Sequence, residues 1–164
     1  MDRLRVAGRR GWLSVLIASY RARIMAYEYS GHTEGTNTSP LRILIADDNA
    51  TVRKLLREFL ESEPGWTVCG EADDGNDALA KAVKLRPDLL LLDISMPELG
   101  GWQACRSIRA QLPELRILII TEHDPDLMQV AVLAEGVHGF VAKSEAVRTL
   151  KGAVAAAMNR ELTA

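Results

Sequence analysis

The chain has 164 residues, 48% of them hydrophobic and 26% charged, which is typical of one soluble α/β-sized domain with a substantial core. Its formal net charge of −2 is unevenly spread, because residues 1–40 carry six arginines and three acidic residues while residues 41–164 carry 14 basic and 19 acidic ones. An acidic domain lacks the basic surface that phosphate backbones require, so direct nucleic-acid binding is not expected.

The first forty residues differ in composition from the rest of the chain. A basic front and a short apolar run over residues 12–20 are followed by a Gly/Ser/Thr-rich linker over residues 30–40. Three interpretations remain open: a weak signal peptide, a start codon assigned too early with Met25 as the true start, and an interfacial amphipathic anchor. The apolar run is too short to span a bilayer, so no transmembrane segment is expected. Residues 1–40 are therefore interpreted as an N-terminal extension that is either disordered or the result of a mis-assigned start.

Cysteine and histidine placement argues against redox or metal chemistry based on these residues. Cys69 and Cys105 lie inside apolar periodic segments, where they are predicted to be small core residues of a cytoplasmic protein. A redox role is the less favoured alternative. The three histidines (His32, His123 and His138) do not have the spacing of metal ligands.

From residue 41 onward, apolar runs alternate with helical patterns. Strands are predicted over residues 41–46, 66–71, 88–93, 115–120 and 137–142. Apolar residues at helical spacing predict helices around residues 52–60, 79–83, 105–112, 126–135 and 147–158. Alternating strands and helices with short connections predict a doubly wound α/β fold, in which five helices cover both faces of a five-stranded parallel sheet.

The fourth predicted helix is unusually apolar. Within residues 127–134 only Gln129 is polar, which indicates burial on more than one side. The alternative, that its alanines simply tolerate exposure, stays open.

Charged and hydroxyl side chains gather at the ends of the predicted strands. These residues are Asp47, Asp48, Asp93, Thr121 and Lys143. Glu71 ends the second strand and lies off to the side. In open parallel sheets the carboxyl ends of the strands form the ligand-binding edge. Asp93 alone is read equally well as a cap for the loop that follows it, so the hypothesis of a site rests on the group.

Three converging carboxylates repel one another unless they share a cation. Oxygen ligands that leave room for water and phosphate suit Mg²⁺. A hydroxyl and an ammonium that face the same carboxylate suit a transferred phosphoryl group. The pattern therefore predicts a magnesium-assisted phosphoryl site.

Four segments carry a family resemblance: "ILIADDN", "LLLLDISMPELGGW", "ILIITEHD" and "GVHGFVAKS". In order and spacing they resemble the response regulator receiver domain, over residues 41–160, with residues 161–164 as a C-terminal tail. The sequences of these segments are most similar to receivers of the subclass that usually carries a C-terminal helix-turn-helix, here without that output domain. The resemblance implies a flavodoxin-like sheet with strand order 2-1-3-4-5.

The resemblance also implies roles for single residues. Asp93 would accept a phosphoryl group from a histidine kinase or a histidine phosphotransfer protein. Thr121 and Lys143 would contact that group, and Thr121 and Phe140 would act as switch residues. The implied Mg²⁺ ligands are Asp47, Asp48, Asp93 and the backbone carbonyl of Ser95. Such a protein is a phosphoacceptor that assists its own phosphorylation and dephosphorylation, rather than an enzyme.

Three positions depart from the family pattern. Glu122 adds a negative charge where a small residue is usual, and we favour a solvated side chain there. Ser144 stands where proline is common, which leaves the geometry of the Lys143–Ser144 peptide bond open. Phe140 replaces the more frequent tyrosine, so no hydroxyl is present at this position.

Two classes of function fit these observations. The first is a stand-alone two-component phosphorelay module, which signals to an unknown output protein or to a second copy through the face of the fourth helix, fifth strand and fifth helix. The second is a phosphorylation-independent binding scaffold, or a shortened relative of a DNA-binding response regulator. The complete set of strand-end residues favours the first.

Overall fold

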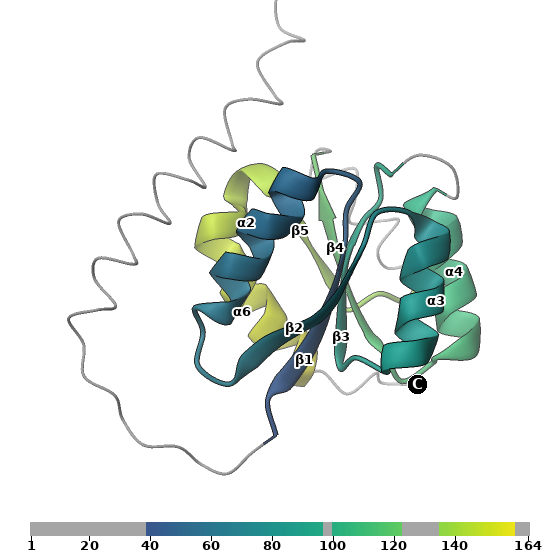
Figure 1. Cartoon of the computed structure of the whole chain (residues 1–164), viewed down its shortest axis with the longest axis horizontal. Helices are drawn as coiled ribbons and strands as arrows, with labels where there is room; N and C mark the ends of the chain where they lie inside the picture. The colour runs from purple at the N-terminus through teal and green to yellow at the C-terminus, as the bar shows by residue number, and fades with distance from the viewer. Residues whose placement is uncertain (1–38, 97–99, 123–134, 160–164) are drawn as a thin grey trace, which may run out of the picture.

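The computed structural model describes residues 39–96, 100–122 and 135–159. The strands are β1 (Leu41–Ala46), β2 (Trp66–Ala72), β3 (Leu89–Asp93), β4 (Arg116–Thr121) and β5 (Gly139–Ala142). The helices are α2 (Ala50–Glu61), α3 (Gly75–Leu85), α4 (Gly101–Gln111), the short 3₁₀ helix η1 (Lys143–Glu145) and α6 (Ala146–Asn159). All strand pairs are parallel and their order is β2-β1-β3-β4-β5, which confirms the predicted fold class (Figure 1).

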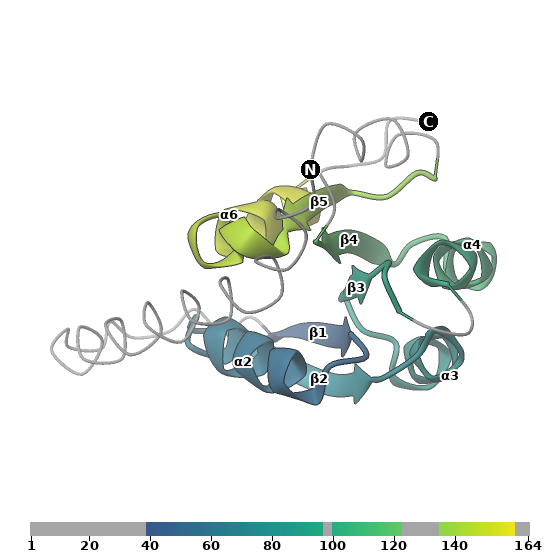
Figure 2. The same ribbon diagram turned by 90° about the horizontal axis from the view of Figure 1, so that it is seen from above.

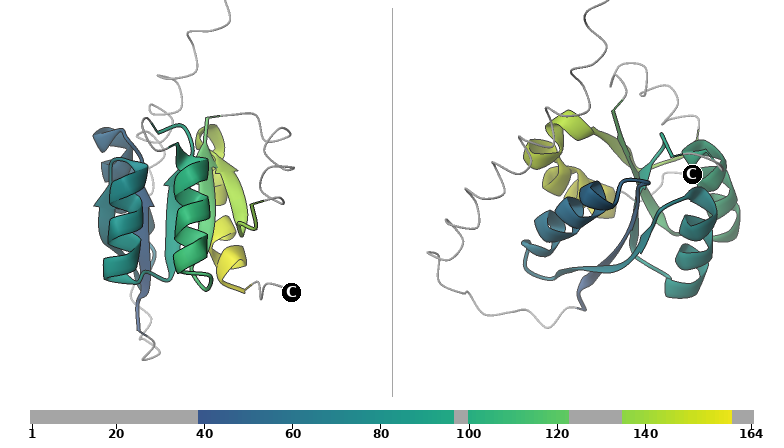
Figure 3. Two further views of the ribbon diagram at one scale, coloured as in Figure 1. Left: turned by 90° about the vertical axis from the view of Figure 1, so that its right-hand side faces the viewer. Right: turned by 45° about the horizontal axis from the view of Figure 1, so that its top comes forward.

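Helices cover both faces of the sheet (Figures 2 and 3). Successive strand side chains point to opposite faces, so each strand contributes to two cores. In β1, Ile43 and Ile45 pack in the core beneath α2 and α6, whereas Leu44 and Ala46 pack in the core beneath α3 and α4. The sheet is therefore apolar on both sides, as a covered parallel sheet must be.

The leucine run of β3 is the central example of this double burial. All four leucines of residues 89–92 are fully buried, and β3 pairs with β1 on one side and β4 on the other. The strand predicted over residues 88–93 is therefore present as β3, which begins one residue later and is buried on both faces. Because β3 is held on all sides, its last residue, Asp93, has a fixed position at the carboxyl edge of the sheet.

Side-chain caps start the two helices that follow β1 and β2. The Asn49 side chain accepts the Thr51 amide at 2.9 Å and the Val52 amide at 3.3 Å, which satisfies two otherwise unpaired donors at the start of α2. Asp74 accepts the Asp77 amide at 2.8 Å at the start of α3. Each helix thus begins close to the strand end that precedes it.

Several strand ends differ from the prediction. β4 begins at Arg116 and includes Thr121, so it lies one residue further along the chain than predicted. β5 is shorter than predicted and begins at Gly139. The His138 side chain explains the later start, because its Nδ1 accepts the Ile117 amide at 3.1 Å where a strand carbonyl would otherwise pair.

The predicted helix over residues 79–83 is corrected in part. Leu79 and Ala82 contact the core as their spacing predicts, whereas Val83 is 37% exposed and lies outside it.

Of the two cysteines, Cys105 is fully buried and burial raises the pKa of its thiol to about 11. Cys69 is half-buried, and its thiol donates to the Ile43 carbonyl at 3.4 Å.

Parts of the prediction lie outside the described residues. These parts are residues 1–38 of the N-terminal extension, residues 126–134 of the fourth predicted helix, and the tail over residues 161–164. Within the described ranges, no peptide bond is cis, so the Lys143–Ser144 bond is trans. None of the helices in those ranges has both the length and the apolar character needed to cross a membrane.

Candidate functional site

Four of the five predicted site residues are buried together at the carboxyl edge of the sheet. Asp47 directly follows β1, Asp93 ends β3, Thr121 ends β4 and Lys143 directly follows β5. Their exposed fractions are 0%, 1%, 0% and 4%, respectively. Asp48 is the exposed member of the group. Burial of this many polar side chains next to one another requires compensating contacts.

Lys143 supplies the main compensation. Its Nζ lies 2.7 Å from Asp47 Oδ2 and 2.7 Å from Asp93 Oδ2, so one ammonium bridges two buried carboxylates. Burial alone would lower the pKa of Lys143, but the two carboxylates outweigh it and hold that pKa above its usual value. Burial raises the pKa of Asp47, with the Lys143 charge opposing it. Lys143 therefore remains protonated at neutral pH.

Backbone amides hold the remaining carboxylate oxygens. The Asn49 amide donates to Asp47 Oδ1 at 2.9 Å, and the Ser95 amide donates to Asp93 Oδ1 at 2.8 Å. Both contacts reach back two residues, the spacing of an Asx turn. Each buried carboxylate is thus fixed by an amide on one oxygen and by Lys143 on the other.

The acidic cluster fits a hard divalent cation. Asp47, Asp48 and Asp93 each offer a carboxylate oxygen, and these three oxygens lie within 4.8 Å of one another. An all-oxygen donor set with one exposed member suits Mg²⁺, which keeps several water ligands. The Ser95 carbonyl stays a predicted ligand, because the contact that the structure shows for Ser95 is through its amide.

The two predicted switch residues occupy the neighbouring strand pair. Thr121 pairs in register with Ala142 of β5, immediately before Lys143. Phe140 stands opposite Ile119 and is partly buried against the core beneath α3 and α4. Glu122 is exposed, which agrees with a solvated side chain.

A charged network next to the site is absent from the sequence-based prediction. Arg53 of α2 donates from Nη1 to the Asp47 carbonyl at 2.7 Å and from Nε to Glu71 Oε2 at 3.2 Å. Arg57, one turn later, donates to Glu71 Oε1 at 2.6 Å. Burial would raise the pKa of Glu71, but the two guanidiniums outweigh it and lower that pKa. The available signal was the four-residue spacing of the two arginines on one flank of α2.

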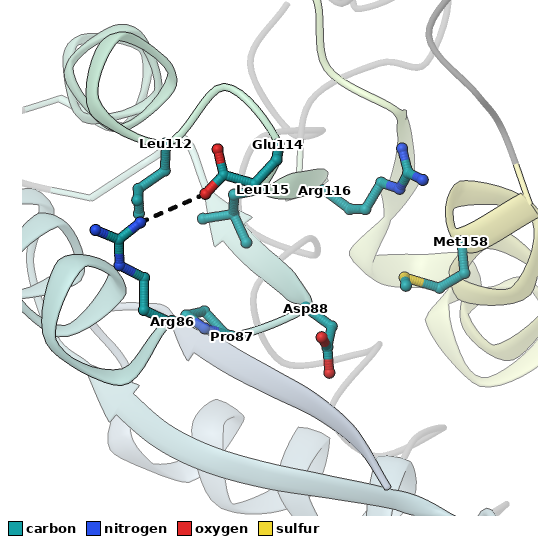
Figure 4. A pocket seen from close by; sticks show the side chains of 8 residues that line it. All are labelled: Arg86, Pro87, Asp88, Leu112, Glu114, Leu115, Arg116 and Met158. Carbon is teal, nitrogen blue, oxygen red and sulfur yellow. Dashed lines mark hydrogen bonds and ion pairs between the residues drawn. The ribbon is translucent and has the colours of Figure 1, made fainter. Parts of the chain in front are cut away.

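A separate hollow of about 340 Å³ lies away from this site (Figure 4). It is bordered by Asp88 just before β3, by Arg116 at the start of β4 and by Met158 near the end of α6. These positions place it at the amino ends of the strands. The hollow therefore contains none of the strand-end residues of the acidic cluster.

A family model described as the response regulator receiver domain matches residues 43–155. The chain belongs to this family. The match includes every residue of the acidic cluster and most residues of both cores. The sequence resemblance is thereby confirmed, including the flavodoxin-like strand order.

Relatives of this receiver combine it with different activities. It is 42% identical to a protein-glutamate methylesterase/protein-glutamine glutaminase of Symbiobacterium thermophilum over 63% of the chain and 29% of that protein. It is 33% identical to the uncharacterized transcriptional regulatory protein YxjL of Bacillus subtilis over 76% of the chain and 57% of that protein. The chain thus spans less than two thirds of these relatives.

Solved structures give the same result. The response regulator domain of Thermotoga maritima CheB has a TM-score of 0.69 at 28% identity, over 74% of this chain and 98% of that one. A LuxR-family two-component response regulator from Aurantimonas sp. SI85-9A1 has a TM-score of 0.70 at 33% identity, over 73% and 86% of the two chains. The similarity to transcriptional regulators agrees with the predicted subclass.

Proposed function

We propose that this receiver accepts a phosphoryl group on Asp93 from the phosphohistidine of a kinase or phosphotransfer protein. The observation that carries the proposal is the double contact of Lys143, whose ammonium lies 2.7 Å from both Asp93 and Asp47. One ammonium between the proposed acceptor carboxylate and a second buried carboxylate offsets part of their charge, as a phosphoryl-transfer site requires. The buried Thr121 hydroxyl on the adjacent strand completes the polar edge.

The transfer uses groups whose positions the fold fixes. A carboxylate oxygen of Asp93 forms the new P–O bond while the P–N bond of the phosphohistidine breaks. The electron pair of that bond stays on the imidazole nitrogen of the donor, which then takes up a proton. Lys143, already beside Asp93, offsets the charge of the incoming group, and the rigid β3 strand provides in-line positioning.

Asp47, Asp48 and Asp93 would hold Mg²⁺, with the Ser95 carbonyl as a fourth proposed ligand. When bound, this ion supplies positive charge next to the acceptor carboxylate and the phosphoryl oxygens. The chain's own contribution is to preorganise the oxygen ligands, since both buried carboxylates are already fixed by the Asn49 and Ser95 amides.

The output is proposed to be a change in protein–protein contacts. Thr121 ends β4, and Phe140 lies on β5, the strand that leads along the chain into Lys143 and α6. A shift of Thr121 toward a phosphoryl group would alter the packing of this region and thereby the surface of β5, α6 and the predicted fourth helix. The receiver acts as a phosphoacceptor in a cytoplasmic two-component pathway, and no direct nucleic-acid contact is expected of its acidic domain.

Phosphorylation from a small donor tests the assignment of Asp93. Incubation with acetyl phosphate and Mg²⁺ should add one phosphoryl group, detected by intact mass, in an acid-stable and base-labile linkage. Asp93→Asn should remain unlabelled, because an amide is a poor nucleophile for this transfer. Asp88→Asn is the matched control, since Asp88 is an exposed carboxylate at the opposite edge of the sheet. Equal labelling of Asp93→Asn and the wild type would overturn the assignment.

The phosphorylation-independent scaffold is the competing function. If the protein is such a scaffold, acetyl phosphate should add no phosphoryl group to it and Mg²⁺ should not bind. The buried bridge between Lys143 and two carboxylates disfavours it, because burial of charges without a functional reason is costly.

A further inference from the structure

Asp48 is the weakest point of the acidic cluster. Its side chain is exposed, and within the described part of the chain no hydrogen bond or ion pair reaches its carboxylate. Asp47 and Asp93, in contrast, are each held by an amide and by Lys143. Because Asp48 has no side-chain support, its position is determined by its backbone alone.

That backbone is held on one side by Arg53. The Asp47 carbonyl and the Asp48 amide belong to one planar peptide unit, so a contact that fixes the carbonyl also fixes the plane from which Asp48 begins. Arg53 Nη1 donates to this carbonyl at 2.7 Å. On the other side, the Asp47 amide donates to the Ala72 carbonyl of β2 at 3.1 Å. The peptide chain is thus fixed just before Asp48.

Arg53 is itself held in place by Glu71. Its Nε donates to Glu71 Oε2 at 3.2 Å, while Arg57 donates to the other oxygen at 2.6 Å. The Glu71 backbone is also restrained, since its carbonyl accepts Lys81 Nζ at 2.5 Å. The Arg53 side chain is only 16% exposed, so its two contacts are partly shielded from water. Arg53 reaches its two acceptors from two different nitrogens of its rigid, planar fork, whereas a lysine would have to reach both from a single nitrogen.

We propose that Arg53 is a positioning residue for the metal site, held by Glu71 and acting on Asp48 through the Asp47 carbonyl. This inference rests on the proposed magnesium-assisted function and adds the residue that orients its exposed ligand. Groups that orient metal ligands from outside the coordination shell affect metal affinity strongly. Arg53 acts without touching the metal or the phosphoryl group.

The test compares Mg²⁺ affinity in two arginine variants of the full chain. Arg53→Lys keeps the charge but loses the simultaneous contact to the Asp47 carbonyl and Glu71, and it should weaken Mg²⁺ binding by about tenfold. Arg57→Lys is the matched control, because Arg57 contacts the same glutamate but not Asp47. Its Mg²⁺ affinity should remain within about twofold of the wild type, because no ligand-orienting contact is removed. Affinity is measured by calorimetry, and backbone amide shifts of residues 47–49 report the local geometry.

Thermal unfolding of the metal-free proteins separates positioning from general stability. If Arg53 contributed only to stability, Arg53→Lys and Arg57→Lys would bind Mg²⁺ with equal affinity when each is measured at the same interval below its own melting temperature. Glu71→Gln provides a second variant, which should reproduce part of the Arg53→Lys loss because Arg53 is then held less firmly. A double variant should lose no more than Arg53→Lys alone, since both changes act on one path.

The outcomes distinguish this inference from the proposed function. Wild-type protein that binds Mg²⁺ and is labelled on Asp93, together with an Arg53→Lys variant of unchanged affinity, overturns the positioning role and leaves the proposed function intact. Wild-type protein that neither binds Mg²⁺ nor is labelled overturns both. A loss of about tenfold in Arg53→Lys and a smaller loss in Glu71→Gln, with Arg57→Lys within about twofold of the wild type, supports the inference.

Discussion

At the scale of single residues, Lys143 determines the charge state of the site. Without a metal ion, its ammonium is the positive charge that lies between the Asp47 and Asp93 carboxylates. A divalent cation would therefore share its ligands with Lys143. We therefore expect this lysine to stabilise the metal-free state and to make the proposed metal site weaker than three carboxylates alone would give.

Replacement of Lys143 should make stability depend on the metal. In Lys143→Ala, two buried carboxylates lose their partner, and the free energy of unfolding without metal should fall by about 3 kcal/mol at pH 7. The loss should grow as pH rises. Burial raises the pKa of Asp47 in the folded state, and Lys143 no longer opposes this in the variant. The folded state is therefore favoured while Asp47 is protonated, and this stability is lost as pH rises through the raised pKa. Saturating Mg²⁺ should restore more stability to this variant than to the wild type.

Denaturant unfolding of both proteins with and without Mg²⁺ measures the effect. Asp48→Ala is the control, since it removes an exposed ligand and should lose the Mg²⁺ response with little change in metal-free stability. A Lys143→Ala variant that Mg²⁺ stabilises no more than the wild type would show that lysine and metal do not share ligands.

At the scale of elements, the first residue of α4 packs against the acceptor loop, by which we mean the residues that directly follow Asp93, the proposed phosphoacceptor. A Cβ atom at Gly101 would lie 2.5 Å from the Asp93 carbonyl oxygen and would also contact the Ile94 Cα, both of which are backbone atoms. This position therefore excludes a side chain. The close approach fixes α4 against Ile94. It thereby also restrains the next residue, Ser95, whose amide donates to Asp93 Oδ1.

Two alanine substitutions test this close approach. Gly101→Ala should destabilise the protein by about 3 kcal/mol, because the backbone must shift to relieve the clash. Gly152→Ala in α6 is the matched control: a Cβ there meets nothing within 4 Å, so alanine should stabilise the helix by about 0.5–1 kcal/mol. Thermal unfolding gives both values. Equal behaviour of the two variants would mean that α4 does not press on the acceptor loop.

Within the described residues, the sequence was sufficient to predict the strands and the main helices, because apolar periodicity reports directly on burial. The leucines of β3 and the apolar face of α2 illustrate this. It was less informative where a side chain replaces a backbone contact, as His138 does before β5. It also missed Arg53, because an arginine on a helix flank looks the same whether it faces water or a carbonyl from another segment. Strand-end carboxylates are visible in a sequence, whereas the groups that orient them are not.

At the scale of the whole molecule, the two cores connect the site to distant surfaces. Strands β4 and β5 contribute alternate side chains to both cores, so a displacement of Thr121 or Phe140 affects packing on either face. Within this pair, β5 is the edge strand of the sheet, and helix α6 packs against both β4 and β5 (Figure 3). A change at the acceptor is therefore expected to reach the outer surface at this end of the sheet.

Phosphorylation should change how the whole receiver associates with other proteins or with a second copy. Beryllofluoride with Mg²⁺, used as a phosphoryl mimic, should alter self-association or partner binding, measured by light scattering and pull-down, with no gain in DNA affinity. The acidic charge of residues 41–164 disfavours contacts to nucleic-acid phosphates. Met128→Asp, within the predicted fourth helix, should remove the response by placing a charge on the proposed contact face.

Val83→Asp is the matched control, because Val83 is an exposed apolar residue on α3, over the β2 and β1 side of the sheet. It should leave the response unchanged, and Asp93→Asn should show none with the same mimic. A rise in DNA affinity with unchanged association would contradict the proposed output. If Met128→Asp and Val83→Asp both lost the response, the proposed contact face would be wrong. A response confined to one face cannot depend equally on α3 and on residue 128.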